Sequence, residues 1–284
     1  MSLSSPVPEY VVVGHVTRDL LPDGGYTLGG TATFAALAAT RLGLAVGMLT
    51  SGGPEVEQLA GEGLSVQCCP AGETTVFENI YLGHRRLQYI RGLACTIHPA
   101  DVPDLWRLAP IVHLGPIAQE VDTALVAAFP GALLGITPQG WLRSWDQQGL
   151  VSPAVWTEST RVLEAADLVV LSLDDLGGDR DLLQTYIDRS RLLVLTMGDQ
   201  GAIVHRKGSA QRVPAYAVQE VDPTGAGDVF AAGYLIRYAE TGDPIEAARY
   251  ANCVASFVVE GPGATCLPTR EQVEDRLAHG RLVD

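Results

Sequence analysis

One stretch decides the interpretation of this chain: Val221-Asp222-Pro223-Thr224-Gly225-Ala226-Gly227-Asp228. An apolar, helix-prone run, VFAAGYLIRYAE, follows it directly. Two glycines separated by an alanine allow backbone N–H groups to turn toward one point. The first turn of a helix adds unpaired N–H groups and the positive end of the helix dipole. The stretch therefore predicts an anion-binding loop that needs no lysine. Asp228 lies in the first helical turn, and a carboxylate beside such a loop suits a reaction in which a hydroxyl loses its proton while it takes a phosphoryl group.

Outward from this loop, apolar segments of strand length alternate with helical stretches. Continuous apolar strands separated by helices indicate a parallel sheet that is covered on both faces. In open sheets of this kind, ligands bind beyond the carboxyl ends of the strands, where Thr196-Met197-Gly198 lies. The expected strands are 10–16, 44–49, 111–115, 132–136, 167–172 and 192–198, and the early alanine-rich helix is 31–43.

Two further segments alternate apolar and polar residues, which predicts β-hairpins. One covers residues 74–90 around Gly83-His84, and the other covers residues 201–216. A hairpin placed between crossover units is typical of an appendage or lid. The sequence therefore predicts an α/β protein with a small β-sheet beside its main sheet.

Composition limits the classes of partner. The chain is 47% hydrophobic and 18% charged, with a formal net charge of −14, so we expect a globular protein that binds neither nucleic acid nor an anionic membrane. Lys207 is the single lysine. A phosphate ligand must therefore be held by backbone amides, by arginine or by a metal ion.

The five cysteines are Cys68, Cys69, Cys95, Cys253 and Cys266, and they have no CxxC spacing. We expect free thiols in a reducing compartment, and the six scattered histidines form no metal-ligand pattern with one another. No segment approaches the roughly 20 apolar residues of a membrane span. The first ten residues lack the features of a signal peptide, so the expected location is the cytoplasm.

Other glycine-rich motifs fit this loop less well. A dinucleotide-binding GxGxxG is excluded because Phe230 occupies the third glycine position, and no Walker A sequence occurs in the chain. A plain turn before a helix remains an alternative for the loop alone.

The combination of motifs is more specific than any one of them. Gly29-Gly30 followed by a helix, then TMGDQGA, then DPTGAGD with AAGY after it, resembles the PfkB family of carbohydrate kinases, the ribokinase-like group. The resemblance implies a three-layer αβα fold in a single domain, 1–284, with a mostly parallel sheet and lid segments near 16–30 and 74–90. It also implies transfer of the γ-phosphoryl group of ATP, with Mg²⁺, to a hydroxyl of a small sugar, polyol or cyclitol. Asp228 is then the catalytic base, and the N–H groups of Gly225, Ala226 and Gly227 form the anion hole.

The same resemblance places the acceptor near the N-terminal segment. Asp19 would accept hydrogen bonds from substrate hydroxyls, and Gly29-Gly30 would let the substrate approach the backbone. Phe34 stands where the family often has an asparagine that contacts the sugar. The LGG-plus-Phe segment is similar to that of the plant inositol kinases, which favours a cyclitol or another modified polyol. Phe34 as an ordinary core residue of the helix is an equal alternative.

On the donor side, the resemblance implies that five residues bind the nucleotide: Thr196, Gly198, Gly201, Asn252 and Gly261. A hydrogen bond to a neighbouring loop is an alternative for Asn252. Asp175 is the expected metal residue, because Ser172 and Asp175 stand where the family often carries an Asn-x-x-Glu motif linked to magnesium and phosphate. A helix N-terminal residue is an equal alternative for Asp175. Arg143 is a candidate for steadying phosphate or substrate charge, with a surface pair to Asp146 as the alternative.

Two other functions stay open at this stage. A nucleoside kinase of the same family would clamp the base with Phe34, Phe77 or Tyr81. A metabolite sensor that kept the kinase fold would bind ligand without turnover, although an intact GAGD argues against it. We also expect that the lid could support a homodimer.

Overall fold

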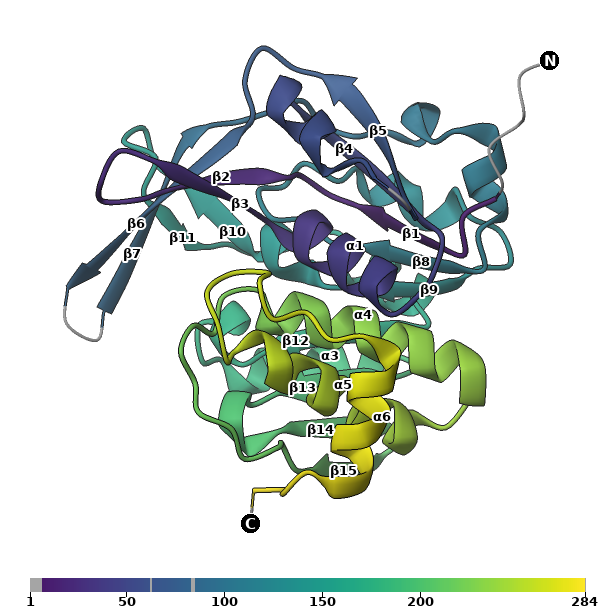
Figure 1. Ribbon diagram of the computed structural model, residues 1–284. Helices are drawn as coiled ribbons and strands as arrows, with labels where there is room; N and C mark the ends of the chain where they lie inside the picture. Colours follow the sequence, from purple (N-terminus) through teal and green to yellow (C-terminus); the bar gives the residue numbers. More distant parts are fainter. Residues whose placement is uncertain (1–6, 62, 83–84, 284) are drawn as a thin grey trace.

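The computed structural model describes residues 7–61, 63–82 and 85–283, and its centre is a nine-stranded sheet (Figure 1). The order across the sheet is β15-β14-β13-β12-β9-β8-β1-β4-β5. Every neighbouring pair from β13 to β5 is parallel, whereas β14 and β15 are antiparallel additions at one edge. The strands are β1 (Tyr10–Val13), β4 (Val46–Gly52), β5 (Leu64–Pro70), β8 (Ile111–Leu114), β9 (Leu133–Ile136), β12 (Leu168–Ser172), β13 (Leu193–Thr196), β14 (Ala202–Arg206) and β15 (Ser209–Val213). The strands predicted from continuous apolar runs are thereby confirmed.

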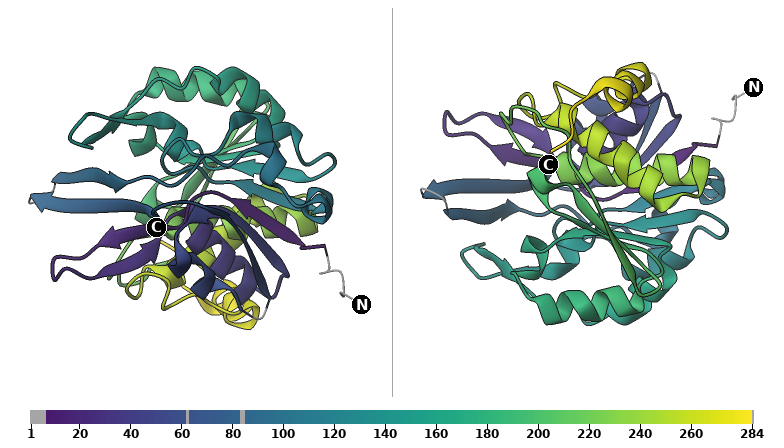
Figure 2. Two further views of the ribbon diagram at one scale, coloured as in Figure 1. Left: turned by 90° about the horizontal axis from the view of Figure 1, so that it is seen from above. Right: turned by 90° about the horizontal axis from the view of Figure 1, so that it is seen from below.

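Helices cover both faces of this sheet, which makes the fold a three-layer αβα sandwich (Figure 2). One face carries α1 (Thr31–Arg41), α4 (Ala226–Thr241), α5 (Pro244–Val258) and α6 (Arg270–His279). The other carries α2 (Ser159–Ala165), α3 (Arg180–Arg189) and several short 3₁₀ turns. The stacked indoles of Trp141 and Trp156, with centroids 4.9 Å apart, fill the second face. None of the described helices combines the length and apolarity that a bilayer crossing demands.

The connections after β8 and β9 differ from the expected regular alternation of strands and helices. The connection after β8 contains the 3₁₀ turn Thr123–Ala127. The connection after β9 contains the 3₁₀ turn Pro138–Leu142 and a two-stranded ribbon, β10 (Arg143–Trp145) with β11 (Val151–Pro153), before α2 begins. In the first of these connections Pro116 and Pro130 lie near the two ends, and Gln119 has a backbone φ of +59°, which an α-helix cannot include.

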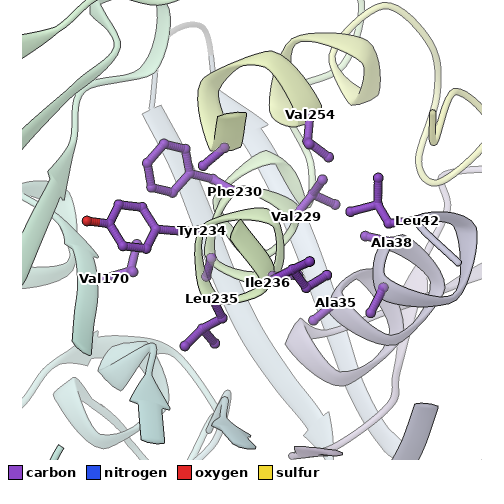
Figure 3. Packing of buried hydrophobic residues seen from close by; sticks show 14 of the residues in the cluster. Ala35, Ala38, Leu42, Val170, Val229, Phe230, Tyr234, Leu235, Ile236 and Val254 are labelled. Carbon is purple, nitrogen blue, oxygen red and sulfur yellow. The ribbon is translucent and has the colours of Figure 1, made fainter. Parts of the chain in front are cut away.

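Helix α4 is buried along most of its length, which fixes the position of its first turn. Small residues on α4 permit close approach of its neighbours, and a Cβ on Gly233 would lie 3.3 Å from Val254 of α5. Figure 3 shows Val229 and Ile236 of α4 lying toward α1, whose Ala35 faces them. The close packing of α1 and α4 brings the N-termini of these two helices together.

A separate four-stranded sheet, ordered β3-β2-β6-β7, projects from the body of the molecule (Figure 2). Its strands are β2 (Thr17–Leu20), β3 (Tyr26–Gly29), β6 (Thr75–Leu82) and β7 (Arg85–Gly92). The hairpin predicted over 74–90 is present, while its Gly83-His84 turn lies outside the described residues. At the base of the sheet the buried His15 ring bonds Thr75 Oγ1 at 2.7 Å, and Ala94 N–H donates to the same hydroxyl. These bonds anchor the small sheet to the end of β1.

Candidate active site

A cleft of about 850 Å³ lies between the small sheet and the first turn of α4, beyond the carboxyl ends of the central strands. It collects residues that are far apart in the sequence. The predicted site residues that line it are Asp19, Gly30, Phe34, Asp175, Thr196, Gly198, Gly201, Gly225, Ala226, Gly227, Asp228 and Asn252. Gly29 and Gly261 are not among the described residues that line it. The cleft is continuous, so acceptor-side and donor-side residues face one shared space.

The glycine loop before α4 has a shape that requires glycine at one position, Gly225. Gly225 has φ +79°, and a Cβ on it would collide with the ring of Phe34. Gly227 is exposed, and a Cβ there would meet nothing within 4 Å. The Asp222 carboxylate steadies the loop by accepting from Thr224 N–H at 2.9 Å and from Gly263 N–H at 3.0 Å.

The backbone amides of this loop are not equivalent. Ala226 N–H already donates to the carbonyl oxygen of Pro223 at 3.2 Å. Within the described part of the chain, no backbone acceptor is found for the N–H groups of Gly225 and Gly227, and no side chain caps α4. Two amides at the mouth of a 16-residue helix therefore remain for an anion.

Asp228 sits in this first turn, partly exposed to the cleft. Thr31 Oγ1 donates a hydrogen bond of 2.7 Å to Asp228 Oδ1. Burial has the largest effect on the pKa of Asp228 and raises it to about 6, although the Thr31 hydrogen bond lowers it. Asp175 and Asp19 raise this pKa further and Arg143 lowers it. Asp228 is thus mostly ionised at neutral pH, with a basicity suited to accepting a proton.

On the acceptor side, Asp19 of β2 faces the cleft, and Thr17 Oγ1 donates to its Oδ1 at 3.1 Å. A Cβ on Gly29 would collide with Asp19 Oδ2, so Gly29 makes room for that carboxylate. In the same small sheet, Gln88 Nε2 of β7 donates to Asn79 Oδ1 of β6 at 3.1 Å, and both amides line the cleft. Sequence reasoning missed this amide pair, because only the β6–β7 register brings the two residues together.

The aromatic residues at this end are mostly covered. Phe34 is 3% exposed and packs against Gly225, while Phe77 is 2% exposed within a small apolar cluster. Phe34 is therefore mainly a core residue, although it also lines part of the cleft. Neither ring offers a free face for stacking a base, and the side chain of Tyr81, the third clamp candidate, lies outside the described residues.

Asp175 lies in the 3₁₀ turn Asp174–Leu176, and hydrogen bonds engage both of its oxygens. Gln139 Nε2 donates to Oδ1 at 2.8 Å, and Ser172 donates to Oδ2 through its N–H and its hydroxyl, each at 2.8 Å. The described residues contain no cluster of three or more His, Cys, Asp or Glu side chains suited to a metal ion. This carboxylate is therefore better placed to hold a metal-bound water than to be one of several direct ligands.

A buried polar chain reaches the cleft from the interior at Thr137. Tyr10 Oη and His113 Nδ1 are 2.8 Å apart, and His113 Nε2 and Thr137 Oγ1 are 3.0 Å apart. Burial lowers the pKa of His113 to about 3, so the ring is neutral. Arg143 of β10 also lines the cleft, and its Nη1 donates to the carbonyl oxygen of Ile117 at 3.3 Å.

The donor side is formed by backbone turns. Gly198 has φ +54°, and Gly201 has φ +87° with no room for a Cβ against the carbonyl oxygen of Val213. Asn252 Nδ2 donates to the carbonyl oxygens of Val213 and Pro214 at 3.1 and 3.0 Å, which ties α5 to this loop. The alternative role of Asn252, a hydrogen bond to a neighbouring loop, is therefore present in the structure. Gly261 is buried, and a Cβ there would collide with Cys266.

An apolar wall continues the donor side, and the segment 281–283 is part of it. Ala217 N–H donates to Arg281 O at 2.8 Å, and Val283 N–H donates to Ala215 O at 2.9 Å. This pairing places Val283 against the cleft, whereas Leu282 points away and is exposed. The remaining small and aliphatic residues of the wall are Ala215, Ala217, Val218, Ala255 and Val259.

Comparisons with known proteins identify chains that are similar to this one. A model described as "pfkB family carbohydrate kinase" matches residues 151–270. The chain is 29% identical over 259 residues to a cytidine kinase of Thermococcus kodakarensis, covering 84% of this chain and 91% of that protein. It is 31% identical to a probable fructokinase-5 of Arabidopsis thaliana, but that match spans 58% of this chain and 57% of the fructokinase.

A solved structure has the same fold. It is a pyrophosphate-dependent kinase of the ribokinase family in complex with sulfate, with a TM-score of 0.78 and 20% identity. The match covers 93% of this chain and 99% of that one. The predicted fold class and the predicted family resemblance are confirmed.

Proposed function

As a homologue of the pfkB family carbohydrate kinases, this chain is, we propose, an enzyme that transfers the γ-phosphoryl group of ATP to a hydroxyl of a small sugar, polyol or cyclitol. The observation that carries the proposal is the Asp228 carboxylate beside two open amides, at the point where the two ends of the cleft meet. A non-catalytic sensor has no need of a base with a pKa near 6 at this point.

The geometry supports the following step. The acceptor hydroxyl gives its proton to Asp228 as its oxygen forms a bond to the γ-phosphorus, and the bond from that phosphorus to the β,γ-bridging oxygen breaks. ADP leaves with the bridging oxygen, and Asp228 later returns its proton to solvent. The amides of Gly225 and Gly227 at the start of α4 stabilise the charge on the transferring phosphoryl oxygens.

The donor end suits a nucleotide better than pyrophosphate. Arg143 is the single basic side chain among the described residues that line the cleft, and Asp199, Glu220 and Asp222 line its donor end. Pyrophosphate would depend on cationic partners, because it has no apolar part to bury. The wall from Ala215 to Val283 provides the apolar surface that a purine requires.

Mg²⁺ fits this site as an ion held mainly by the substrate. Asp175 would hold it through water, and the phosphate oxygens would supply the direct contacts, since the Asp175 carboxylate is already hydrogen-bonded. When bound, such an ion neutralises charge on the β- and γ-phosphates. The acidic lining of the donor end makes this neutralisation necessary.

The acceptor end favours a neutral, hydroxyl-rich molecule. Asp19 accepts hydrogen bonds, and Asn79 and Gln88 both donate and accept them. The buried rings of Phe34 and Phe77 leave no stacking surface for a base. A nucleoside acceptor is the second candidate, because the cytidine kinase match extends over most of both chains.

The test is an ADP-release assay with Mg²⁺-ATP and a panel of inositols, hexoses, pentoses and nucleosides. We expect one of the polyols or sugars to be the best acceptor, and pyrophosphate to be a poor donor. A nucleoside that exceeds every polyol would select the second candidate. No stimulation by any acceptor would favour the sensor.

The position of Val283 gives a donor-specific prediction. Val283→Trp is expected to raise the KM for ATP at least about tenfold, because the indole would occupy space beside the proposed purine, and to leave the KM for the acceptor unchanged. Steady-state kinetics with each substrate varied in turn measure both values. Leu282→Trp is the matched control, because Leu282 is exposed on the other side of the same segment. Equal ATP KM values for the two variants would contradict this placement of the base.

The small sheet is proposed to act as a lid that excludes water when an acceptor binds. Leu21, Tyr26 and Ile80 are exposed apolar residues on or beside this sheet, which supports the further proposal of a homodimer through it. Sedimentation of the wild type and of Ile80→Asp tests the homodimer, and a monomeric wild type would exclude it.

We also propose that the protein is located in the cytoplasm.

A further inference from the structure

Thr31, the first residue of α1, has a fixed orientation beside the carboxylate of Asp228. Its hydroxyl donates to Asp228 Oδ1 at 2.7 Å, and the residue is 1% exposed. Its methyl carbon Cγ2 packs against Gly115 so closely that a Cβ on Gly115 would collide with it. Because the methyl group is confined on that side, the hydroxyl has little freedom to leave the carboxylate.

The two helices that carry this pair are locked together. Phe34, one turn along α1, fills the space against Gly225 at the start of α4. Farther along, Val229 and Ile236 of α4 lie toward Ala35 and Ala38 of α1 (Figure 3). The Thr31–Asp228 bond is therefore part of a rigid interface, and it uses only one of the two carboxylate oxygens.

We propose that Thr31 is a positioning residue for the phosphoryl transfer: it orients the Asp228 carboxylate and leaves Oδ2 to take the proton of the acceptor hydroxyl. This inference rests on the proposed kinase function. It assigns to Thr31 an action through Asp228, without contact to substrate.

The surroundings of Asp228 show why such a bond is needed. Burial raises the pKa of Asp228, and the negative charges of Asp19 of β2 and of Asp175 raise it further. Arg143 of β10 and the Thr31 hydroxyl oppose them. Tyr10 of β1 also interacts electrostatically with this carboxylate, and burial raises the pKa of Tyr10 well above the ordinary value, so Tyr10 stays neutral. The Thr31 hydrogen bond is the larger of the two opposing effects.

The test compares Thr31→Val, which keeps the shape and removes the hydroxyl, with Thr31→Ser, which keeps the hydroxyl. Loss of a hydrogen bond to the ionised form raises the pKa of Asp228, so the acid limb of the kcat/KM profile moves to higher pH, by about one pH unit. We expect kcat at pH 7 to fall about tenfold in Thr31→Val through loss of orientation, with the KM for ATP unchanged, and Thr31→Ser to restore both properties.

Thr40→Val is the control, because it removes a hydroxyl from the same helix, where Thr40 Oγ1 donates to Ala36 O away from the cleft. If Thr31→Val matches Thr40→Val in kcat and pH profile while the wild type is active, the positioning role is wrong and the kinase stands. If the wild type phosphorylates no acceptor, the proposed function fails. Carbon-13 NMR titration of the Asp228 carboxyl in the free protein then still decides whether Thr31 lowers its pKa. Thr31→Ala replaces Thr31→Val in both measurements should the valine variant not fold.

Discussion

Asp228→Asn is expected to lower kcat by about 10²–10⁴-fold, the range in which a positioned base contributes. The amide keeps the shape of the side chain but accepts no proton from the acceptor hydroxyl. The loop amides and the apolar donor wall are unchanged, so the affinity for ATP should stay within about twofold of the wild-type value. Single-turnover kinetics and equilibrium ATP titration separate the two effects.

The same variant should not lose stability. A carboxyl group whose pKa is raised in the folded state destabilises the fold while it is ionised. This penalty is full above about pH 6, declines as the pH falls below that value, and is gone only below the unfolded pKa. Asparagine carries no charge, so the Tm of Asp228→Asn at pH 7.5 should equal or exceed that of the wild type, as is common where function imposes strain.

Asp181→Asn is the matched control, because Asp181 lies in the first turn of α3 and is exposed. If Asp228 only complemented a helix dipole, both variants would lose a little stability and neither would lose turnover. That pattern would remove the basis of the enzyme assignment.

The sequence was sufficient to predict the layers of the fold, because the strands are continuous apolar runs. Tyr10 to Val13 and Leu168 to Leu171 are buried on both faces of the sheet, and this burial gives them an unbroken apolar pattern. The connections after β8 and β9 had no comparable signal. Their 3₁₀ turns depend on local proline and glycine placement and on tertiary packing.

The glycine loop was also visible in the sequence, whereas its partners were not. Thr31 and Asp228 are separated by 197 positions, and no local pattern links a threonine after Gly30 to a carboxylate on another helix. From the sequence, Phe34 could be interpreted either as a substrate contact or as a core residue. Only the structure shows that its ring packs against Gly225 at the start of α4. Asn79 and Gln88 became candidates only through strand register.

Gly227→Val is expected to lower kcat/KM for ATP by about 10²–10³-fold, comparable to the loss of one donor from an oxyanion hole. Gly227 is exposed at the start of α4, with open space where a side chain would go. That space is where the phosphates would lie, so a valine there should exclude the donor without disturbing the free protein. The Tm should remain within about 2 °C of the wild-type value, since surface substitutions are nearly neutral.

Two other glycines supply the contrast that makes this result decisive. Gly72→Val also projects into open space, but outside the cleft, and should change neither property. Gly225→Ala combines a positive φ with a collision against Phe34, so it should lower the stability by about 1–3 kcal/mol as well as the activity. Normal ATP turnover by Gly227→Val would place the phosphates elsewhere and contradict the anion hole. Loss of turnover at unchanged Tm means instead that the open space in front of Gly227 belongs to the donor, because a folding defect of the Gly225→Ala kind would lower both quantities together.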